Sequence, residues 1–139
     1  MRTLLRFTVL VLLAPTLLLA QQTSAKHDPS KEIAEVNGGA GPCSIEITVF
    51  GLDAKPIYGA TVKVHIAYGF GGFRRLDLSA GTNSDGKVKF TGLPSRVHLP
   101  PLEFDATKDD LTGMLMYDPE SQCQATQSIS LHKATPQGQ

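Results

Sequence analysis

The chain has no tryptophan, few aromatic residues and no excess of either charge. Aromatic residues make up 6% of its 139 residues, and thirteen lysines and arginines balance thirteen aspartates and glutamates. The lack of a basic surplus argues against a nucleic-acid-binding protein. With only two cysteines, 41% hydrophobic residues and 19% charged residues, the composition also excludes collagen-like, disulfide-dense and strongly disordered chains. It predicts one globular domain.

Long hydrophobic runs are missing except at the N-terminus. Residues 1–20 carry Arg2 and Arg6, followed by an apolar stretch over residues 7–19 that ends beside a small residue. This is the pattern of a secretory signal peptide. The stretch is too short, and too broken by Pro15, to span a membrane comfortably. We therefore expect a secreted protein, periplasmic or extracellular, with no stable membrane insertion after the signal peptide is cleaved.

Export determines how the two cysteines, Cys43 and Cys123, are interpreted. In an oxidising compartment an even pair is most simply one disulfide. Without a short C-x-x-C spacing or clustered histidines, a metal pair is disfavoured, as is a reactive thiol. Closing a loop of about 80 residues is expected to stabilise the domain by roughly 4 kcal/mol.

Composition divides the rest of the chain into a leader, a folded unit and a tail. Residues 21–42 are predicted to be a flexible leader, with at most two turns of helix over residues 30–36 and a glycine-rich linker over residues 37–42. The folded unit spans residues 43–133. Residues 134–139 are predicted to form a polar, disordered tail.

Hydrophobic residues within the folded unit recur with a period of two, which is typical of half-buried strands. Seven short strands are predicted, at residues 45–49, 60–68, 76–80, 88–90, 102–106, 113–117 and 129–131. The first two are expected to be consecutive antiparallel strands, and residues 83–86 a tight turn. The pattern indicates an all-β, antiparallel, Ig-like β-sandwich with Greek-key connections. A disulfide would then place the first and last strands side by side and parallel.

Three segments resemble the carboxypeptidase regulatory-like domain, a family grouped with transthyretin-like and collagen-adhesin B-type domains. Residues 51–62 carry a D-x-x-P-x-x-G-A-x-V pattern, residues 82–94 a T-x-x-D-G-x-x-x-F-x-x-L-P pattern, and residues 102–108 an alternating strand. The resemblance implies a transthyretin-like sandwich over about residues 44–113. It specifies fold more than function, because one sandwich carries many roles.

No catalytic constellation is evident. The four histidines, His27, His65, His98 and His132, are scattered along the chain. His65 and His132 would form a metal pair only if their strands were neighbours, and solvated surface histidines are the simpler interpretation. The acidic residues of three loops are typical of turns rather than of a calcium site; they are Asp85, Asp109, Asp110, Asp118 and Glu120. We expect no metal, no cofactor and no catalytic residue.

The most unusual segment is the glycine-rich loop over residues 68–75. Its candidate binding residues are Tyr68, Phe70, Phe73, Arg74 and Arg75. Mobile aromatic side chains beside paired arginines are suited to stacking on a sugar or gripping an anionic partner. Alternatively, Phe70 and Phe73 fold back as a plug over the open end of the core.

Two functions remain open at this stage. The first is a non-enzymatic secreted module that binds a protein or a glycan. The alternative is a small secreted hydrolase or metal-dependent enzyme on a transthyretin-like scaffold. A deep polar pocket with a convergent cluster of histidine, aspartate and arginine would favour the enzyme.

Overall fold

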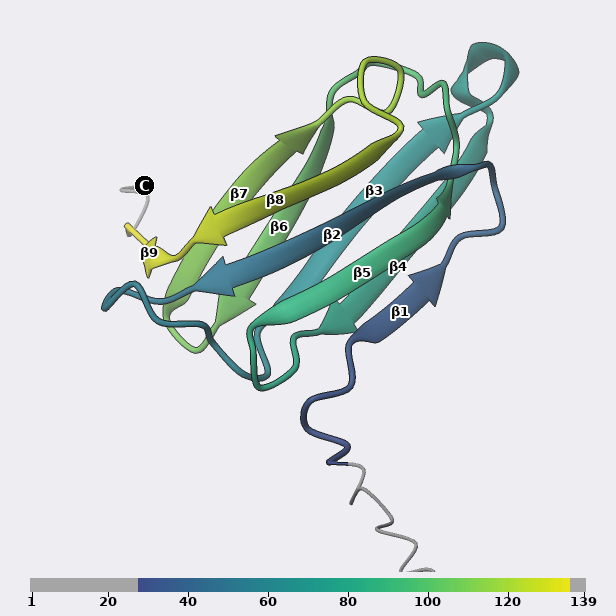
Figure 1. Ribbon diagram of the computed structural model, residues 1–139. Coiled ribbons are helices and arrows are strands. Elements are labelled where there is room, and N and C mark those ends of the chain that lie inside the picture. Colours follow the sequence, from purple (N-terminus) through teal and green to yellow (C-terminus); the bar gives the residue numbers. More distant parts are fainter. Residues whose placement is uncertain (1–27, 136–139) are drawn as a thin grey trace, which may run out of the picture.

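The computed structural model describes residues 28–135, so the predicted signal peptide lies outside the described residues. Two sheets pack face to face in a β-sandwich, which confirms the predicted fold class (Figure 1). The four-stranded sheet has the order β1-β5-β2-β8 and the five-stranded sheet the order β4-β3-β6-β7-β9. The strands are β1 (Ala34–Asn37), β2 (Cys43–Phe50), β3 (Thr61–Tyr68), β4 (Arg74–Gly81), β5 (Lys87–Leu93), β6 (Leu102–Lys108), β7 (Leu111–Tyr117), β8 (Gln124–Ser130) and β9 (His132–Lys133). Over the same residues, no helix is long and apolar enough to cross a membrane.

The period of two in the sequence produces the core directly. Every second residue of β2, from Cys43 to Val49, is fully buried, and its neighbours are only half-buried. Phe90 of the four-stranded sheet meets Phe104 of the five-stranded sheet edge to face, with 5.2 Å between ring centroids. Phe104 in turn lies 6.2 Å from Tyr117. This aromatic contact joins the two layers, and edge-to-face pairs of this kind add to the free energy gained by burial alone.

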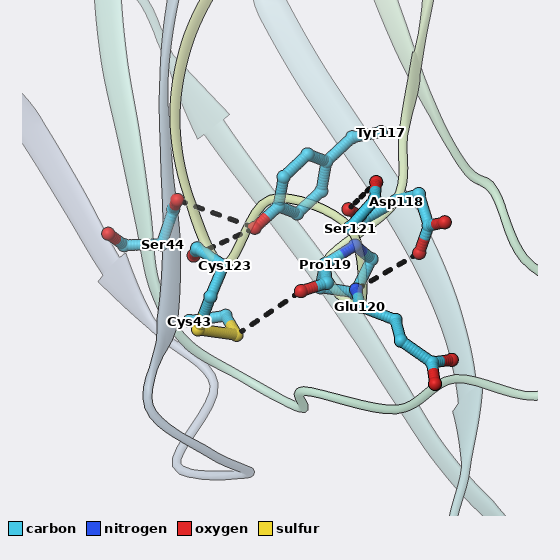
Figure 2. Close-up of a disulfide and its surroundings, with 8 residues drawn as sticks. All are labelled: Cys43, Ser44, Tyr117, Asp118, Pro119, Glu120, Ser121 and Cys123. Carbon is cyan, nitrogen blue, oxygen red and sulfur yellow. Dashed lines mark hydrogen bonds between the residues drawn. A yellow bond between two sulfur atoms is a disulfide. The ribbon is translucent and has the colours of Figure 1, made fainter.

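A disulfide joins Cys43 at the start of β2 to Cys123 just before β8, as predicted. The two strands are parallel neighbours, with Ser44 opposite Gln124. Tyr117 packs beside the disulfide and its hydroxyl donates a 3.0 Å hydrogen bond to the carbonyl of Cys123 (Figure 2). The first and last long strands of the folded unit therefore lie side by side, as the disulfide requires.

Two local connections differ from expectation. β2 and β3 were expected to pair, but they lie in different sheets, and so do β4 and β5 on either side of the 83–86 turn. The reason is a hydrogen-bond network between the two connecting turns. The buried hydroxyl of Thr82 donates to the carbonyl of Ile57 and accepts from the amide of Ala60. The turns thus bond to each other and carry the chain from one layer to the other.

The predicted leader also differs, because part of it belongs to the sheet. Ala34–Asn37 forms β1, which pairs in parallel with β5, and residues 30–36, for which at most two turns of helix were allowed, form no helix. The side-chain amide of Asn83 also donates a hydrogen bond to the carbonyl of Lys31, which fixes the residues just before β1. A helix of two turns is marginal in water, whereas the exposed edge of β5 offers a ladder of backbone partners.

Reducing the disulfide is expected to lower the free energy of unfolding by roughly 4 kcal/mol, because the bridge closes a loop of 80 residues. Guanidinium unfolding of the oxidised and reduced protein, followed by circular dichroism, measures the difference. Mass spectrometry before and after reduction checks the state of the two cysteines. Identical unfolding midpoints would contradict a stabilising role for the disulfide.

The second prediction concerns Tyr117. Burial, and then the neighbouring Asp118 carboxylate, raise the pKa of the Tyr117 phenol above its ordinary value of about 10. The folded state therefore holds the phenolic proton more tightly than the unfolded state. The resulting stability is fully present below about pH 10 and is lost as the pH rises through the raised pKa.

Replacing Tyr117→Phe should remove this alkaline loss and should also cost about 1 kcal/mol at neutral pH through the missing hydrogen bond. Urea unfolding at several alkaline pH values measures both effects. Tyr58→Phe is the matched control, since the side chain of Tyr58 is exposed. The assignment fails if the wild type and Tyr117→Phe lose stability in parallel.

Candidate functional site

Polar side chains gather on the outward face of the five-stranded sheet. His65 of β3 lies directly opposite Asp77 of β4 in the antiparallel register. One row along, Lys63 of β3 lies between Ser79 of β4 and Asp105 of β6. Since alternate residues of β3 are buried, the same period that builds the core places these side chains on one outer surface.

His65 and Asp77 form a hydrogen-bonded pair between the imidazole Nδ1 and the carboxylate Oδ1. On the other side of the ring, Nη1 of Arg75 lies 3.4 Å from Nε2 of His65. A guanidinium can only donate hydrogen bonds, so its contact with a neutral imidazole requires Nε2 to be the unprotonated, accepting nitrogen. These two contacts assign the proton of neutral His65 to Nδ1, where it donates to Asp77. The pair thereby leaves the Nε2 lone pair directed away from the carboxylate.

Two loops form one side of a cleft of about 430 Å³ next to His65. This side contains the short 3₁₀ segment η1 (Phe70–Gly72) and the loop of residues 94–101 between β5 and β6. The loops pack closely, because a Cβ on Gly72 would lie only 2.7 Å from the His98 ring. Gly72 also has a positive φ of 69°, so this approach requires glycine.

The cleft combines charged and apolar groups. Its charged and titratable lining consists of His65, Arg75, His98 and Glu103, and Leu99 and Leu102 lie among its apolar walls. His65 also borders a second hollow of about 270 Å³, lined by Lys63, Asp77 and Asp105 among others. His65 lines both hollows, whereas Arg75 lines only the first and Asp77 only the second. The side chains of His65 and Asp77 are 56% and 76% exposed. The three residues therefore meet on an open surface between two hollows, and not in the deep pocket that was to distinguish an enzyme from a passive module.

The aromatic loop is exposed, which rules out the core-plug interpretation. Phe70 and Phe73 are 94% and 82% exposed, and Tyr68 is half-buried. Arg74 and Arg75 are both exposed. Of the five residues proposed for binding, only Arg75 contacts the His65–Asp77 pair. Binding of a partner by the other four stays a prediction.

Sequence reasoning missed Asp77, His98 and Glu103 as site residues. The alternation placed His65 and Asp77 on outward faces, which was the only signal for their meeting. The alternation does not specify the register of β3 against β4, which sets the two residues opposite each other. His98 reaches the cleft because its backbone amide donates a hydrogen bond to the carbonyl of Ala67, which holds the loop over the end of β3. Glu103 reaches it from β6, which pairs with β3.

A metal pair of His65 and His132 is not formed. His132 lies opposite Thr112 on the β9 edge of the sheet, with β6 and β7 between it and β3. Among residues 28–135, no group of three or more histidine, cysteine, aspartate or glutamate side chains is placed to hold a metal ion. The loop acids and amides instead stabilise turns, as Asp118 does by accepting from the amide of Glu120.

No protein-family model and no curated protein sequence matches the chain. Similar solved structures include catechol 1,2-dioxygenase from Acinetobacter sp. ADP1, with 13% identity and a TM-score of 0.46, covering 74% of this chain and 57% of the other. The enzyme from Pseudomonas arvilla C-1 has 14% identity, a TM-score of 0.48 and coverages of 76% and 60%. The dioxygenase domain of a carbohydrate-binding fusion from Streptomyces sp. SirexAA-E has 17% identity, a TM-score of 0.46 and coverages of 82% and 97%.

The likeness is too distant to transfer an activity or a site residue. The chain spans between 57% and 64% of the length of the first four dioxygenase chains that it matches. Any activity of this chain must therefore be argued from its own residues.

The resemblance to the carboxypeptidase regulatory-like domain, and with it the transthyretin-like scaffold, is wrong. No family model matches, and the similar solved structures named above are dioxygenases. The physical reason lies in what the motif residues do. Asp53 accepts from the amide of Lys55, Gly59 takes a positive φ of 70°, and Ala60 is buried. These are general requirements of a turn that leads into a strand, so they do not specify one family.

The expectation of a non-enzymatic module for protein or carbohydrate binding is corrected as well. The three similar solved structures named above are those of enzymes or of an enzyme domain. The expected absence of a catalytic constellation rested on scattered histidines. That scatter along the sequence did not reveal the grouping of His65, Arg75 and Asp77 across two strands.

The tautomer assigned to His65 can be tested by nitrogen-15 NMR. At alkaline pH, where imidazole groups are neutral, the wild type should show His65 protonated at Nδ1. Asp77→Asn removes the accepting carboxylate and should lower the population of that tautomer. Asp105→Asn, on the same face of the sheet, is the control and should leave it unchanged. An Nε2-protonated ring in the wild type would refute the assignment.

Proposed function

We propose that the protein is a small hydrolase whose site is the His65 cleft and whose substrates are esters of small anionic compounds. The observation that supports this proposal best is the His65–Asp77 pair with the Arg75 guanidinium at Nε2. Export into an oxidising compartment belongs to the same proposal and is supported by the Cys43–Cys123 bridge.

His65 acts as the general base in this proposal. Asp77 fixes the ring and stabilises the imidazolium that forms when Nε2 takes a proton. Nε2 removes a proton from a water molecule as the water oxygen bonds to the ester carbonyl carbon. The same proton then passes to the leaving oxygen as its bond to that carbon breaks. No nucleophilic side chain is required, because the water is the nucleophile.

Arg75 supplies substrate recognition and couples it to the base. Its 3.4 Å contact with Nε2 is long for a hydrogen bond and is therefore weak. A carboxylate or phosphate on the substrate offers the guanidinium two charge-assisted hydrogen bonds, which are much stronger than a contact with neutral imidazole. Binding of an anionic substrate draws Arg75 away and frees Nε2 for the water.

The residues around His65 do not fit a resident metal ion. His65 and Asp77 already bond to each other, and the part of the chain that the structure describes adds no third histidine, cysteine or acidic ligand to them. Metal sites of proteins are normally built from three or four such ligands. The mechanism is therefore derived from acid–base chemistry alone.

The test is hydrolysis of p-nitrophenyl hydrogen succinate, an anionic ester, compared with p-nitrophenyl acetate, a neutral one. The wild type should prefer the anionic ester. His65→Asn should lower kcat on both by about a hundredfold or more, which is the usual loss when a general base is removed. Arg75→Gln should raise KM for the anionic ester and leave KM for the neutral ester unchanged, because only the anion uses the guanidinium.

His132→Asn is the matched control, since His132 is an exposed histidine on the opposite edge of the same sheet. It should hydrolyse both esters like the wild type. The proposal is overturned if the wild type is no faster than buffer on either ester. It is equally overturned if His65→Asn and His132→Asn behave alike.

A further inference from the structure

The end of the sandwich beyond β3 carries apolar side chains that the hydrolase site does not use. Phe70, Phe73 and Leu99, which we name the aromatic tip, are 94%, 82% and 79% exposed. They come from two different loops, residues 69–73 and 94–101, which pack together through the backbone bridge of Tyr68 with Val97. Figure 1 shows the loop after β3 projecting from this end of the molecule. Single exposed apolar side chains are ordinary, and it is their gathering on two packed loops at one end of the molecule that marks a contact surface.

The two loops that form the aromatic tip carry basic residues only. Residues 68–75 and 94–101 contain Arg74, Arg75 and Arg96 and no acidic residue. Acidic residues of other segments lie beside them: Glu120 forms a 4.0 Å ion pair with the exposed Arg96, and Glu103 lines the His65 cleft. Within residues 28–135, the guanidinium group of Arg74 has no ion-pair or hydrogen-bond partner. The tip is therefore complementary to an anionic surface.

A groove beside the tip offers donors for phosphate groups. It has a volume of about 470 Å³ and is lined by Phe70, Ser95, Arg96 and His98 among others. Arginine and hydroxyl donors next to an aromatic ring suit a phosphate that lies at the boundary of an apolar phase.

We infer that the aromatic tip docks the protein on a bilayer that contains anionic lipids. Phe70, Phe73 and Leu99 enter the boundary between headgroups and acyl chains, and Arg74 and Arg96 contact lipid phosphates. A folded protein partner would need pockets shaped to receive these three protruding side chains. A bilayer accommodates single side chains without such pockets, which favours lipid as the occupant. This inference does not depend on the proposed hydrolase activity.

The absence of tryptophan allows a direct test, because Phe70→Trp creates a chain with one fluorescent indole. The protein is purified after export by the expression host. It is then mixed with vesicles of phosphatidylcholine alone or of phosphatidylcholine with phosphatidylglycerol. Emission of Phe70→Trp should shift to shorter wavelength with the anionic vesicles and change little with the neutral ones.

Tyr58→Trp is the matched control, since Tyr58 is 63% exposed in the turn between β2 and β3, away from the tip. Its emission should not change with either vesicle.

Arg74→Gln, made in the Phe70→Trp background, should weaken partitioning onto the anionic vesicles about fivefold, the loss expected for one basic residue at an anionic surface. In vesicle sedimentation of chains without the probe, Phe70→Ser with Phe73→Ser should weaken binding by at least about tenfold. Because these side chains are exposed, circular dichroism and unfolding midpoints should stay at wild-type values.

The inference is overturned if the anionic vesicles cause no shift at the tip, or the same shift in Tyr58→Trp. It is also overturned if binding to heparin beads is strong while binding to vesicles is absent, since the surface would then recognise a soluble anionic polymer. Loss of vesicle binding with ester hydrolysis intact, or the reverse, shows which of the two proposals has failed.

Discussion

The parallel pairing of β2 with β8 joins the two ends of the folded unit, and much of the architecture depends on it. Bringing together strands from opposite ends of a chain carries a large loop-closure entropy, and the Cys43–Cys123 bridge removes most of that cost from the unfolded state. With β8 held beside β2, the ring of Tyr117 is buried next to the disulfide, and its hydroxyl donates a hydrogen bond to the carbonyl of Cys123. The aromatic contacts from Phe90 through Phe104 to Tyr117 then link the four-stranded sheet, which holds β2 and β8, to the five-stranded sheet.

The candidate site draws its reactive groups from strands and its wall from loops. His65 and Asp77 stand opposite each other in a ladder of backbone hydrogen bonds, so their contact does not rely on a mobile segment. Rigid placement of this kind is what a general base needs. The loops add enclosure, and Gly72 permits the close approach to His98 that shapes the cleft.

The two proposed surfaces meet in the same loops. Gly72, His98 and Leu99 line the His65 cleft, and residues of these two loops also form the aromatic tip. A tip in contact with lipid holds the mouth of the cleft close to the headgroups. Esters with an anionic group and an apolar part are abundant there, so lipid docking and the chemistry proposed for His65 are compatible.

The sequence alone determined the β-sandwich, the approximate positions of the six strands β2 to β7 and the disulfide, because each of these follows from local alternation or from an even cysteine count. The last strand was expected at residues 129–131, which overlap only the end of β8 (Gln124–Ser130). The same local signals misled where distant segments compete. Residues 34–37 joined the sheet because β5 offered an open edge, and the turn motifs imitated a family without belonging to it. The meeting of His65, Asp77 and Arg75 was decided only by the tertiary structure. Strand register and the choice of sheet depend on the packing of the whole core, and no local stretch of sequence contains that information.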